Sequence, residues 1–467
     1  MIKTIEKRDS NLLWLICRKT LNKGESHMVS LLEKATNFNR KVKINFEGGD
    51  LTSDAGLLLY REFDEKIGFS QTIKDFLKVN DHAKFRIHSN SDIAIQKIYQ
   101  NIAGYHTDDN ADELTIDPAF KAVLSKKTLA SQPTISRFNN RLDINNAKQF
   151  QYINETLMDK VYSIEMPKQV LIDLDSTNCQ TYGNQYGSNY NFHYSANGYH
   201  PLVAFDGLTG DFLKAELRSG NVYTSRQVTR FLGPILNRYS NKYPTIDRFV
   251  RADSGFAVPE LYKLIEDNKA FYAIRLKAYK TLYAKAADIT ARMDLICKDN
   301  IYDYSVVYGE IKYKASKWEN ERRVVVKIEK PEGQMCYNYT FIVTNMTATP
   351  KKVVMFYSNR GTMENFIKES KNGFAFDSMS STEYIANMNK LQLAMLAYNF
   401  NNWFRRLALS TSMKSNRMET IRLKLVKIAA KIINRSRYLT FKLCSSCPYK
   451  KEFWDTLNRI NNLVFLS

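Results

Sequence analysis

Two short acidic segments follow apolar runs that are typical of buried β-strands: IDLDST at 172–177 and RADSG at 251–255. Asp173 and Asp175 are two residues apart and share one face of a strand, so facing alone does not choose between them. Asp175 is the better candidate for a reachable carboxylate, because it lies nearer the strand end and two hydroxyl residues follow it. Asp253 holds the same kind of position in the second segment.

An aspartate at a strand end is often only a turn former, but two of them in one α/β layer suggest a metal site. Hard divalent cations such as Mg²⁺ take oxygen ligands. A two-metal site needs several carboxylates that converge from different elements. We therefore expect a third carboxylate on a helix that packs against these strands.

The segment VVMFYSNRGTMENFIKESK, residues 353–371, is the candidate for that helix. At about 100° per residue, a helical wheel places four side chains within about 60° of one face: Tyr357, Arg360, Glu364 and Lys371. Glu369 falls at about 120°, so the wheel favours Glu364 as the third carboxylate. The Gly-Thr pair at 361–362 could instead begin the helix, and an exposed charged helix with incidental Arg and Lys is the alternative interpretation.

The composition indicates a globular protein that binds an anionic partner. The chain has 467 residues, of which 44% are hydrophobic and 25% charged, and its length suggests about three domains. The 68 Lys and Arg residues against 48 acids leave a net charge of +20, for which nucleic acid is the default partner. A merely soluble protein can also be basic, but the 28 tyrosines supply side chains that contact phosphate or stack on bases.

The cysteines and the termini favour a protein of the reducing cytosol. Six cysteines are spread along the chain, at a density too low for a disulfide scaffold. The CSSC segment at 444–447 lacks a second pair and a nearby histidine, so two structural cysteines near a turn are favoured over a zinc site. The sequence contains no run of about 20 apolar residues, so we predict no membrane-spanning helix. The N-terminus fits no signal peptide, and Met28 is an alternative start.

The pattern along the chain predicts six regions. They are an extension of unknown role, a mainly helical DNA-binding region, the first part of an α/β core, a β-rich insertion, the second part of the core, and a basic helical C-terminal region: 1–40, 41–165, 166–280, 281–350, 351–410 and 411–467. The alternating residues of 41–48 predict an opening strand, and 382–410 predicts a buried helix. The segment 414–442 is predicted to be a basic helix, because its apolar residues keep helical spacing, with its basic side facing phosphates or solvent.

One short helix in the second region resembles the second helix of a helix-turn-helix. The segment LASQPTISRFNNRLD, residues 129–143, reads as a turn followed by a helix with Pro133 in its first turn. Arg137 and Arg141 point to one side of that helix and would enter a DNA groove. A plain surface helix with basic residues is the alternative.

Several motifs together resemble a known family. The spacing Tyr-x₂-Arg-x₃-Glu-x₆-Lys in 353–371 is that of the YREK signature of DDE transposases of the insertion-sequence-four superfamily. DLDST and RADSGFA resemble the segments with that superfamily's two catalytic aspartates, Asp175 and Asp253. Three more segments resemble the insertion-sequence thirteen-eighty family of bacterial transposases: INFEGGDLTSDAGLLLYREF, IYQNIAGYHTDDNADELTIDPAFK and LASQPTISRFNN.

The resemblance implies an α/β fold with an RNase H-like core, a mixed sheet flanked by helices, and a β-rich insertion between the second aspartate and the glutamate. It implies that Asp175, Asp253 and Glu364 hold two Mg²⁺ ions, for which Mn²⁺ can substitute. One ion would activate a water or a DNA 3′-hydroxyl, and the other would stabilise the leaving oxygen. Such a protein binds the terminal inverted repeats of its element, cuts the ends and joins them to target DNA.

The resemblance also assigns contacts with DNA. Tyr357, Arg360 and Lys371 would contact phosphates near the cut. Trp318 would stack on a base flipped from the element end, although a lone Trp in a β-rich segment is more often core. Handling two ends of double-stranded DNA implies a homodimer on DNA, in the bacterial cytoplasm. An RNase H-like nuclease and a catalytically idle DNA-binding regulator are the alternatives.

Overall fold

The computed structural model describes residues 34–83, 85–298 and 302–465, which fall into two compact units, Met1–Leu51 and Thr52–Ser467. In the first unit, β1 (Lys34–Ala35) pairs with β2 (Lys43–Ile44) in antiparallel fashion. The strand expected at 41–48 is therefore only two residues long. The extension predicted at 1–40 lies mostly outside the described residues, and the finer division into six regions stays a prediction.

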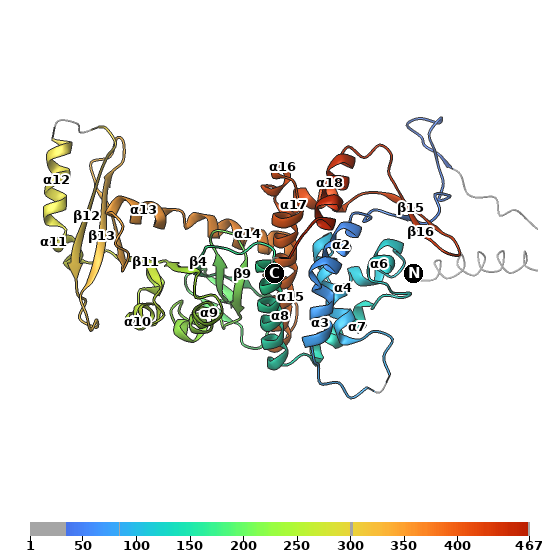
Figure 1. Cartoon of the computed structure of the whole chain (residues 1–467), viewed down its shortest axis with the longest axis horizontal. Coiled ribbons are helices and arrows are strands. Elements are labelled where there is room, and N and C mark those ends of the chain that lie inside the picture. Colours follow the sequence, from blue (N-terminus) through green and yellow to red (C-terminus); the bar gives the residue numbers. More distant parts are fainter. Residues whose placement is uncertain (1–33, 84, 299–301, 466–467) are drawn as a thin grey trace, which may run out of the picture. The chain divides into compact units, whose positions relative to one another are not determined.

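A large mixed sheet is the centre of the second unit (Figure 1). In spatial order its strands among the described residues are β12 (Ser305–Tyr313), β13 (Arg322–Lys330), β14 (Asn338–Thr344), β11 (Phe271–Leu276), β10 (Asp247–Ala252), β4 (Gln169–Ser176), β8 (Leu202–Asp206) and β9 (Phe212–Glu216). β4, β10 and β11 run parallel, and on the other side of β4 the strand β8 is antiparallel to both β4 and β9, so β9 again runs in the direction of β4. Both faces of β4 are covered at this central place in the sheet, and its nearly continuous apolar sequence suits that position.

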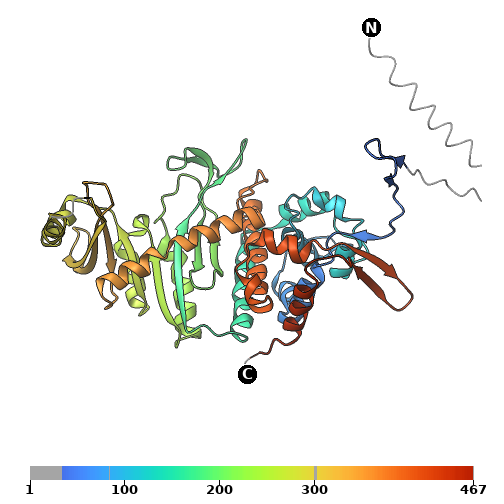
Figure 2. The same ribbon diagram turned by 90° about the horizontal axis from the view of Figure 1, so that it is seen from above.

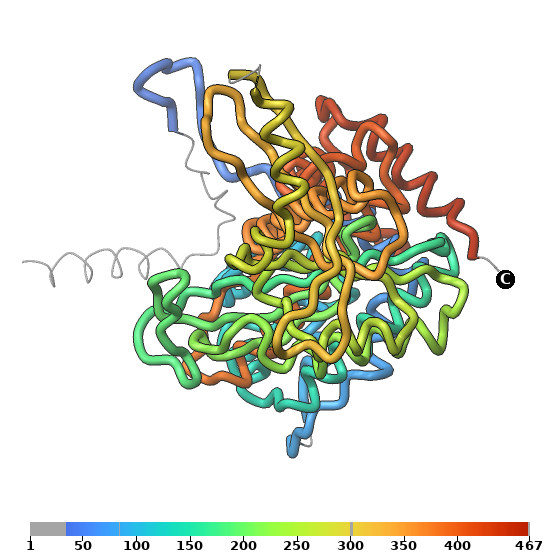
Figure 3. The backbone as a smooth tube through the Cα atoms, turned by 90° about the vertical axis from the view of Figure 1, so that its left-hand side faces the viewer, coloured from blue at the N-terminus to red at the C-terminus, as the bar shows by residue number. Residues whose placement is uncertain are grey.

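The insertion continues the core sheet. β14 pairs with β11 in antiparallel fashion, with Ala273 opposite Thr344, and β13 and β12 follow outward. Two helices precede these strands, α11 (Lys280–Lys285) and α12 (Ala287–Cys297), and α12 packs on β12 and β13. These outer strands face the viewer in Figure 3. The strands predicted between 281 and 350 are thus present, together with helices that the sequence pattern did not reveal.

Helices precede the sheet and cover it. The helices before β4 are α2 (Leu57–Ile67), α3 (Phe69–Phe76), α4 (Asn90–Ala103), α5 (Asn110–Leu114), α6 (Pro118–Val123), α7 (Gln132–Arg141) and α8 (Ile144–Tyr162). Two more connect the parallel strands: α9 (Val228–Lys242) and α10 (Pro259–Asp267). The buried helix expected at 382–410 is α15 (Tyr384–Ala408), which packs on α8, α4 and β9. Phe400 stacks on Phe69 at 4.1 Å between ring centroids, which joins α15 to the helices before the sheet.

The segment at 353–371 is two helices instead of one. α13 (Pro350–Ser358) packs across β11, β12 and β13, and α14 (Gly361–Phe374) packs on α15. The helical conformation is interrupted at Asn359 and Arg360, so the second helix, α14, begins at the Gly-Thr pair. Figure 2 shows both helices following one another along the sheet.

The C-terminal region is not a long basic helix, which corrects the expectation for 414–442. It consists of short helical turns, a β-hairpin and a last helix: α16 (Thr411–Lys414), α17 (Met418–Ile421), η2 (Arg422–Val426), β15 (Ala430–Asn434), β16 (Leu439–Leu443) and α18 (Lys450–Asn461). The segment AKIIN contains β-branched residues that favour a strand, and Arg435 and Tyr438 close the turn by mutual backbone hydrogen bonds. None of the helices among the described residues is long and apolar enough to cross a membrane.

Candidate active site

Asp173 is a buried structural residue. Its carboxylate accepts hydrogen bonds from Nε and Nη2 of Arg251, both at 2.7 Å, and neither side chain is more than 2% exposed. Arg251 also donates to the carbonyl oxygen of Phe356 at 2.6 Å, which ties β10 to α13. Burial raises the pKa of Asp173, and Arg251 opposes that change. This bidentate ion pair leaves Asp173 no room for an external ligand.

Asp175 lies two residues further along β4 and faces the candidate site. Its Oδ2 forms an ion pair with Nη2 of Arg360 at 3.0 Å, and its Oδ1 accepts from the backbone N–H of Ser176 at 2.9 Å. Burial raises the pKa of Asp175 to about 6, against the opposing effect of Arg360. Asp253 and Glu364 add to the increase, so the three carboxylates lie in one another's electric field.

The parallel register brings Asp253 to the level of Asp175. Ala252 pairs with Leu174, and each aspartate follows directly. The Asp253 carboxylate accepts from the backbone N–H of Gly255 at 2.8 Å and so caps a short turn, η1 (Ser254–Phe256). Carboxyl ends of parallel strands meet at one edge of a sheet, which is where folds of this class place ligands.

Two of the four signature residues bond to the end of β4 or just past it, and Glu364 acts electrostatically on Asp175. Arg360 donates to the carbonyl oxygen of Leu174 at 3.1 Å in addition to its pair with Asp175. Lys371 donates to the carbonyl oxygen of Asn178 at 2.6 Å, just past the strand. Glu364 lies in the first turn of α14, where the helix dipole favours a carboxylate.

Tyr357 and Glu369 occupy different surroundings. Tyr357, near the end of α13, is largely buried, and burial raises its pKa, with Arg360 opposing the change. Glu369 accepts from Nη1 of Arg405 with both oxygens, at 3.0 and 3.1 Å, and from the backbone N–H of Met418 at 2.8 Å. Glu369 thus faces α15, on another side of α14 from Glu364, as the wheel predicts.

Two residues near the aspartates were missed by the sequence reasoning. Arg275 of β11 acts electrostatically on Tyr357, and Tyr194 lies in the field of both Asp175 and Asp253. The charged residue near the end of the apolar strand FYAIRL was a usable signal for Arg275. Tyr194 lies in a polar segment whose position relative to the aspartates only the fold determines.

The three acids fit a hard divalent cation by chemistry. All their donor atoms are carboxylate oxygens, and burial first, then the charges of Asp253 and Glu364, raises the pKa of Asp175, so a bound cation would favour its ionised form. Within the described residues, however, no three His, Cys, Asp or Glu side chains are arranged to hold a metal ion as they stand. The cation beside Asp175 is the guanidinium of Arg360.

Trp318, predicted to stack on a flipped base, lies in the core of this structure. Its side chain is 6% exposed and packs edge-on against Tyr262 and Tyr313, at 5.4 and 5.5 Å between ring centroids. The guanidinium of Arg322 lies over the indole ring at 5.6 Å. The ring is part of the core beside the insertion strands, so no face is open to a nucleobase.

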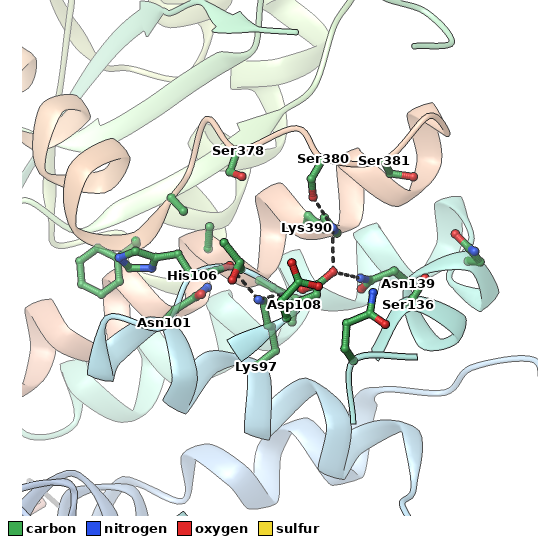
Figure 4. A pocket seen from close by; sticks show the side chains of 18 of the residues that line it. Lys97, Asn101, His106, Asp108, Ser136, Asn139, Ser378, Ser380, Ser381 and Lys390 are labelled. Atoms are coloured by element: carbon green, nitrogen blue, oxygen red, sulfur yellow. Dashed lines mark hydrogen bonds and ion pairs between the residues drawn. The ribbon is translucent and has the colours of Figure 1, made fainter. Parts of the chain in front are cut away.

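Of the two arginines predicted to enter a DNA groove, one is exposed and one is engaged in the fold. Arg137 is exposed on α7. Arg141 donates to Oδ1 of Asn90 at 2.8 Å and lies 3.5 Å from Asp81. A pocket of about 510 Å³ borders the buried side of α7, where Lys97 and Lys390 both pair with Asp108, at 2.8 and 3.0 Å (Figure 4).

That pocket contains none of the three candidate acids. Its two lysines neutralise Asp108, and Asn139 of α7 donates to the same carboxylate at 3.2 Å. These contacts join α4, α7 and α15, so we interpret them as structural contacts that hold α7 in place.

Cys444 and Cys447 flank a turn and are both free, with the Sγ of Cys444 3.2 Å from the hydroxyl of Ser446.

Of the comparisons with known proteins, the family model identifies the family of this chain. No curated protein matches the chain. A solved structure of the piggyBac transposase synaptic complex with hairpin DNA has 13% identity and a TM-score of 0.41, over 85% of this chain and 82% of that one, a likeness too weak to support an argument. Residues 34–465 match the family described as transposase DDE domain group 1. With most of its length matched, the chain belongs to the DDE transposase family.

Proposed function

We propose that this protein is a DNA transposase that binds the terminal inverted repeats of an insertion sequence, cleaves the element ends and joins them to target DNA. The observation that carries the proposal is the convergence at the end of β4. Asp175, Asp253 and Glu364 share one electrostatic site there, in a chain of the DDE transposase family. The finer placement in the insertion-sequence thirteen-eighty family rests on the motifs in the sequence.

We propose that the core is RNase H-like. Its five inner strands lie in the order β9-β8-β4-β10-β11, which is 3-2-1-4-5 in chain order of those strands. Only the second strand, β8, runs in the opposite direction, because it pairs antiparallel with both β4 and β9, and the other four strands point the same way. This order and these directions support the assignment.

In the proposed mechanism, Asp175, Asp253 and Glu364 hold two Mg²⁺ ions, which Mn²⁺ can replace. When bound, such ions activate the attacking oxygen and stabilise the leaving oxygen of an in-line displacement at phosphorus. Arg360 would exchange its pair with Asp175 for a phosphate, which its planar guanidinium can bind with two hydrogen bonds. Lys371 and Tyr357 bind further phosphate oxygens.

The partner is double-stranded DNA, at the element ends and at the target. The net charge of +20 supports phosphate-dominated binding, which we expect to weaken steeply as salt rises. We propose that Arg137 and Arg141 of α7 contribute groove contacts, and that the protein works as a homodimer on DNA. The free cysteines of the described residues support a reducing location, the bacterial cytoplasm.

The test uses a plasmid that carries a marker between the DNA segments flanking this gene. With Mg²⁺, the wild-type protein should excise the marker and join it to a second plasmid. Asp175→Ala, Asp253→Ala and Glu364→Ala should each lose cleavage while gel-shift binding to the flanking DNA persists. Normal cleavage by any one of them would remove that residue from the proposed triad.

The alternatives predict different products. A nuclease of the same core would cleave without joining, and an idle DNA-binding regulator would bind without either reaction. The absence of a ready metal-binding arrangement among the described residues is the observation that favours the regulator. Joined products that require all three acids would exclude both alternatives.

A further inference from the structure

The segment between β4 and β8 differs in chemistry from the rest of this basic chain. Residues 177–199, here called the aromatic flap, contain no Lys, Arg, Asp or Glu. Asn, Gln, Ser, Tyr and Gly predominate, which is the composition of surfaces that bind by stacking and adaptable hydrogen bonds. The flap folds into a small antiparallel sheet of β5 (Cys179–Gln180), β6 (Asn189–Asn191) and β7 (Ala196–Tyr199).

The rings of the flap are exposed to an unusual degree. Five side chains are between 40% and 86% exposed: Tyr182, Tyr186, Tyr190, Phe192 and Tyr194. The rings of Tyr190 and Phe192 meet edge-on at 5.2 Å between centroids. Exposed aromatic rings gathered in one short segment mark an interaction surface, because scattered single rings are the norm on protein surfaces.

The backbone of the flap is held firmly while its rings stay exposed. The N–H of Tyr186 donates to the carbonyl oxygen of Thr382 at 2.8 Å, and the hydroxyl of Tyr199 donates to the carbonyl of Tyr186 at 2.7 Å. On the opposite edge, Nδ2 of Asn191 donates to the carbonyl of Gly220 at 2.7 Å. A surface ordered in advance loses less conformational entropy when it binds a partner.

The flap also adjoins the candidate active site. It begins two residues after Asp175, and Lys371 of the signature holds its second residue, Asn178, by the carbonyl oxygen. Tyr194 lies close enough to Asp175 and Asp253 for both to raise the pKa of its hydroxyl, after the larger effect of burial. Figure 2 shows the green strands that follow β4 projecting beside the sheet.

We propose that the aromatic flap binds unpaired bases of the DNA strand beside the scissile phosphate, by stacking on Tyr190, Phe192 and Tyr194. The proposal rests on the proposed function. A surface without cations is poorly suited to phosphates, whereas rings stack on any base and side-chain amides bond base edges. The flap would hold the bases while Arg360 and Lys371 hold the backbone of the same strand.

The first test measures binding of a fluorescein-labelled 16-nucleotide single strand of mixed sequence, and of the duplex of that sequence, by anisotropy in EDTA. The double variant Y190A/F192A should weaken single-strand binding about tenfold or more, since one stacked base contributes roughly 1–3 kcal/mol. Duplex binding should change less than twofold. Trp454→Ala, which removes an exposed ring from α18, is the matched control and should leave both affinities unchanged.

A second measurement reports stacking directly. A 2-aminopurine base in the single strand should lose fluorescence on binding to the wild type and to Phe192→Tyr, but not to Y190A/F192A. Equal losses of single-strand and duplex affinity would overturn the proposal. So would unchanged single-strand affinity combined with a changed oligomeric state in size-exclusion chromatography, which would identify the flap as a contact between two copies of the chain.

The two proposals fail in distinguishable ways. If the proposed function is wrong, the wild type shows no metal-dependent cleavage or joining, whatever its flap binds. If the flap proposal is wrong, the wild type cleaves, and Y190A/F192A binds single strands and cleaves as the wild type does. Circular dichroism and the thermal midpoint of Y190A/F192A should match the wild type, because both rings lie on the surface.

Discussion

Asp173 and Asp175 lie two residues apart on one strand, yet each has its own arginine and a different surrounding. Asp173 and Arg251 form a bidentate pair that is at most 2% exposed, in the interior between β4, β10 and α13. Asp175 and Arg360 form a single contact whose side chains are 17% and 14% exposed, beside two further carboxylates. The same residue pair is thus closed within the core in one region and partly exposed beside other carboxylates in the other.

The two carboxylates differ in how many of their oxygens the arginine occupies. Asp173 uses both oxygens on one partner, so nothing further can bind without breaking that pair. Asp175 has one ion-pair contact, with Arg360 between α13 and α14, and its other oxygen accepts only from the backbone N–H of Ser176.

The largest expected effect is on stability, at the interior pair. Asp173→Asn leaves the buried Arg251 guanidinium without its counter-charge, which should cost about 3–5 kcal/mol of unfolding free energy. Urea denaturation measures the change, with Asp253→Asn as a control in a more accessible place. A loss below about 1 kcal/mol would remove the distinction between the two regions.

The second-largest effect is on the rate of DNA cleavage, at the Asp175–Arg360 pair. Asp175→Asn should lower the cleavage rate by roughly 10²–10³-fold, the usual consequence of deleting one electrostatic group from an active site. Binding to the flanking DNA should persist, because the phosphate contacts come from other residues. A variant that cleaves at the wild-type rate would show that Asp175 is as remote from the chemistry as Asp173.

A third effect is a dependence of stability on pH in the metal-free protein. The pKa of Asp175 rises from 3.8 to about 6 on folding, so the folded state holds its proton more tightly than the unfolded state does. This contribution to stability is present below about pH 4 and is lost as pH rises through about 6. Asp175→Asn should therefore be more stable than the wild type at pH 7.5 in EDTA, by about 3 kcal/mol. Equal thermal midpoints at pH 7.5 would contradict the raised pKa.

The smallest effect extends the comparison to the two glutamates of α14. Glu369→Ala should cost about 1–2 kcal/mol, because Arg405 and the N–H of Met418 lose a partially buried acceptor, yet cleavage per folded molecule should stay near the wild-type value. Glu364→Ala should do the opposite, with stability within about 0.5 kcal/mol and cleavage lost. Rates normalised to the folded fraction separate the two outcomes.

Local pattern was sufficient for the elements that carry the acids. The apolar runs before Asp175 and Asp253 predict their strands, and the wheel separates Glu364 from Glu369 even though the segment is two helices. The wheel succeeds because both glutamates lie within α14, after the break. The family spacing then selects Asp175 over Asp173, for which the structure supplies the reason, the buried partner Arg251.

Long-range pairing was beyond the reach of local pattern. The strands of the insertion read correctly as strands, but only their partners decide that β14 extends the core sheet at β11. The basic residues around Lys431 keep helical spacing and still form a hairpin, since β-branched neighbours favour a strand. Trp318 reads as an isolated ring in the sequence, and its burial depends on Tyr262, distant in the chain.

The anchoring of Glu369 has a consequence for how this protein can vary between relatives. Four residues separate Glu364 from Glu369, and the bonds to Arg405 and Met418 hold the second half of α14 in one rotation. Inserting or deleting a single residue between the two glutamates would turn Glu364 by about 100° about the helix axis, away from the aspartates. The interval is therefore closed to changes of length, and among single-residue deletions in α14 those between Glu364 and Glu369 should abolish cleavage.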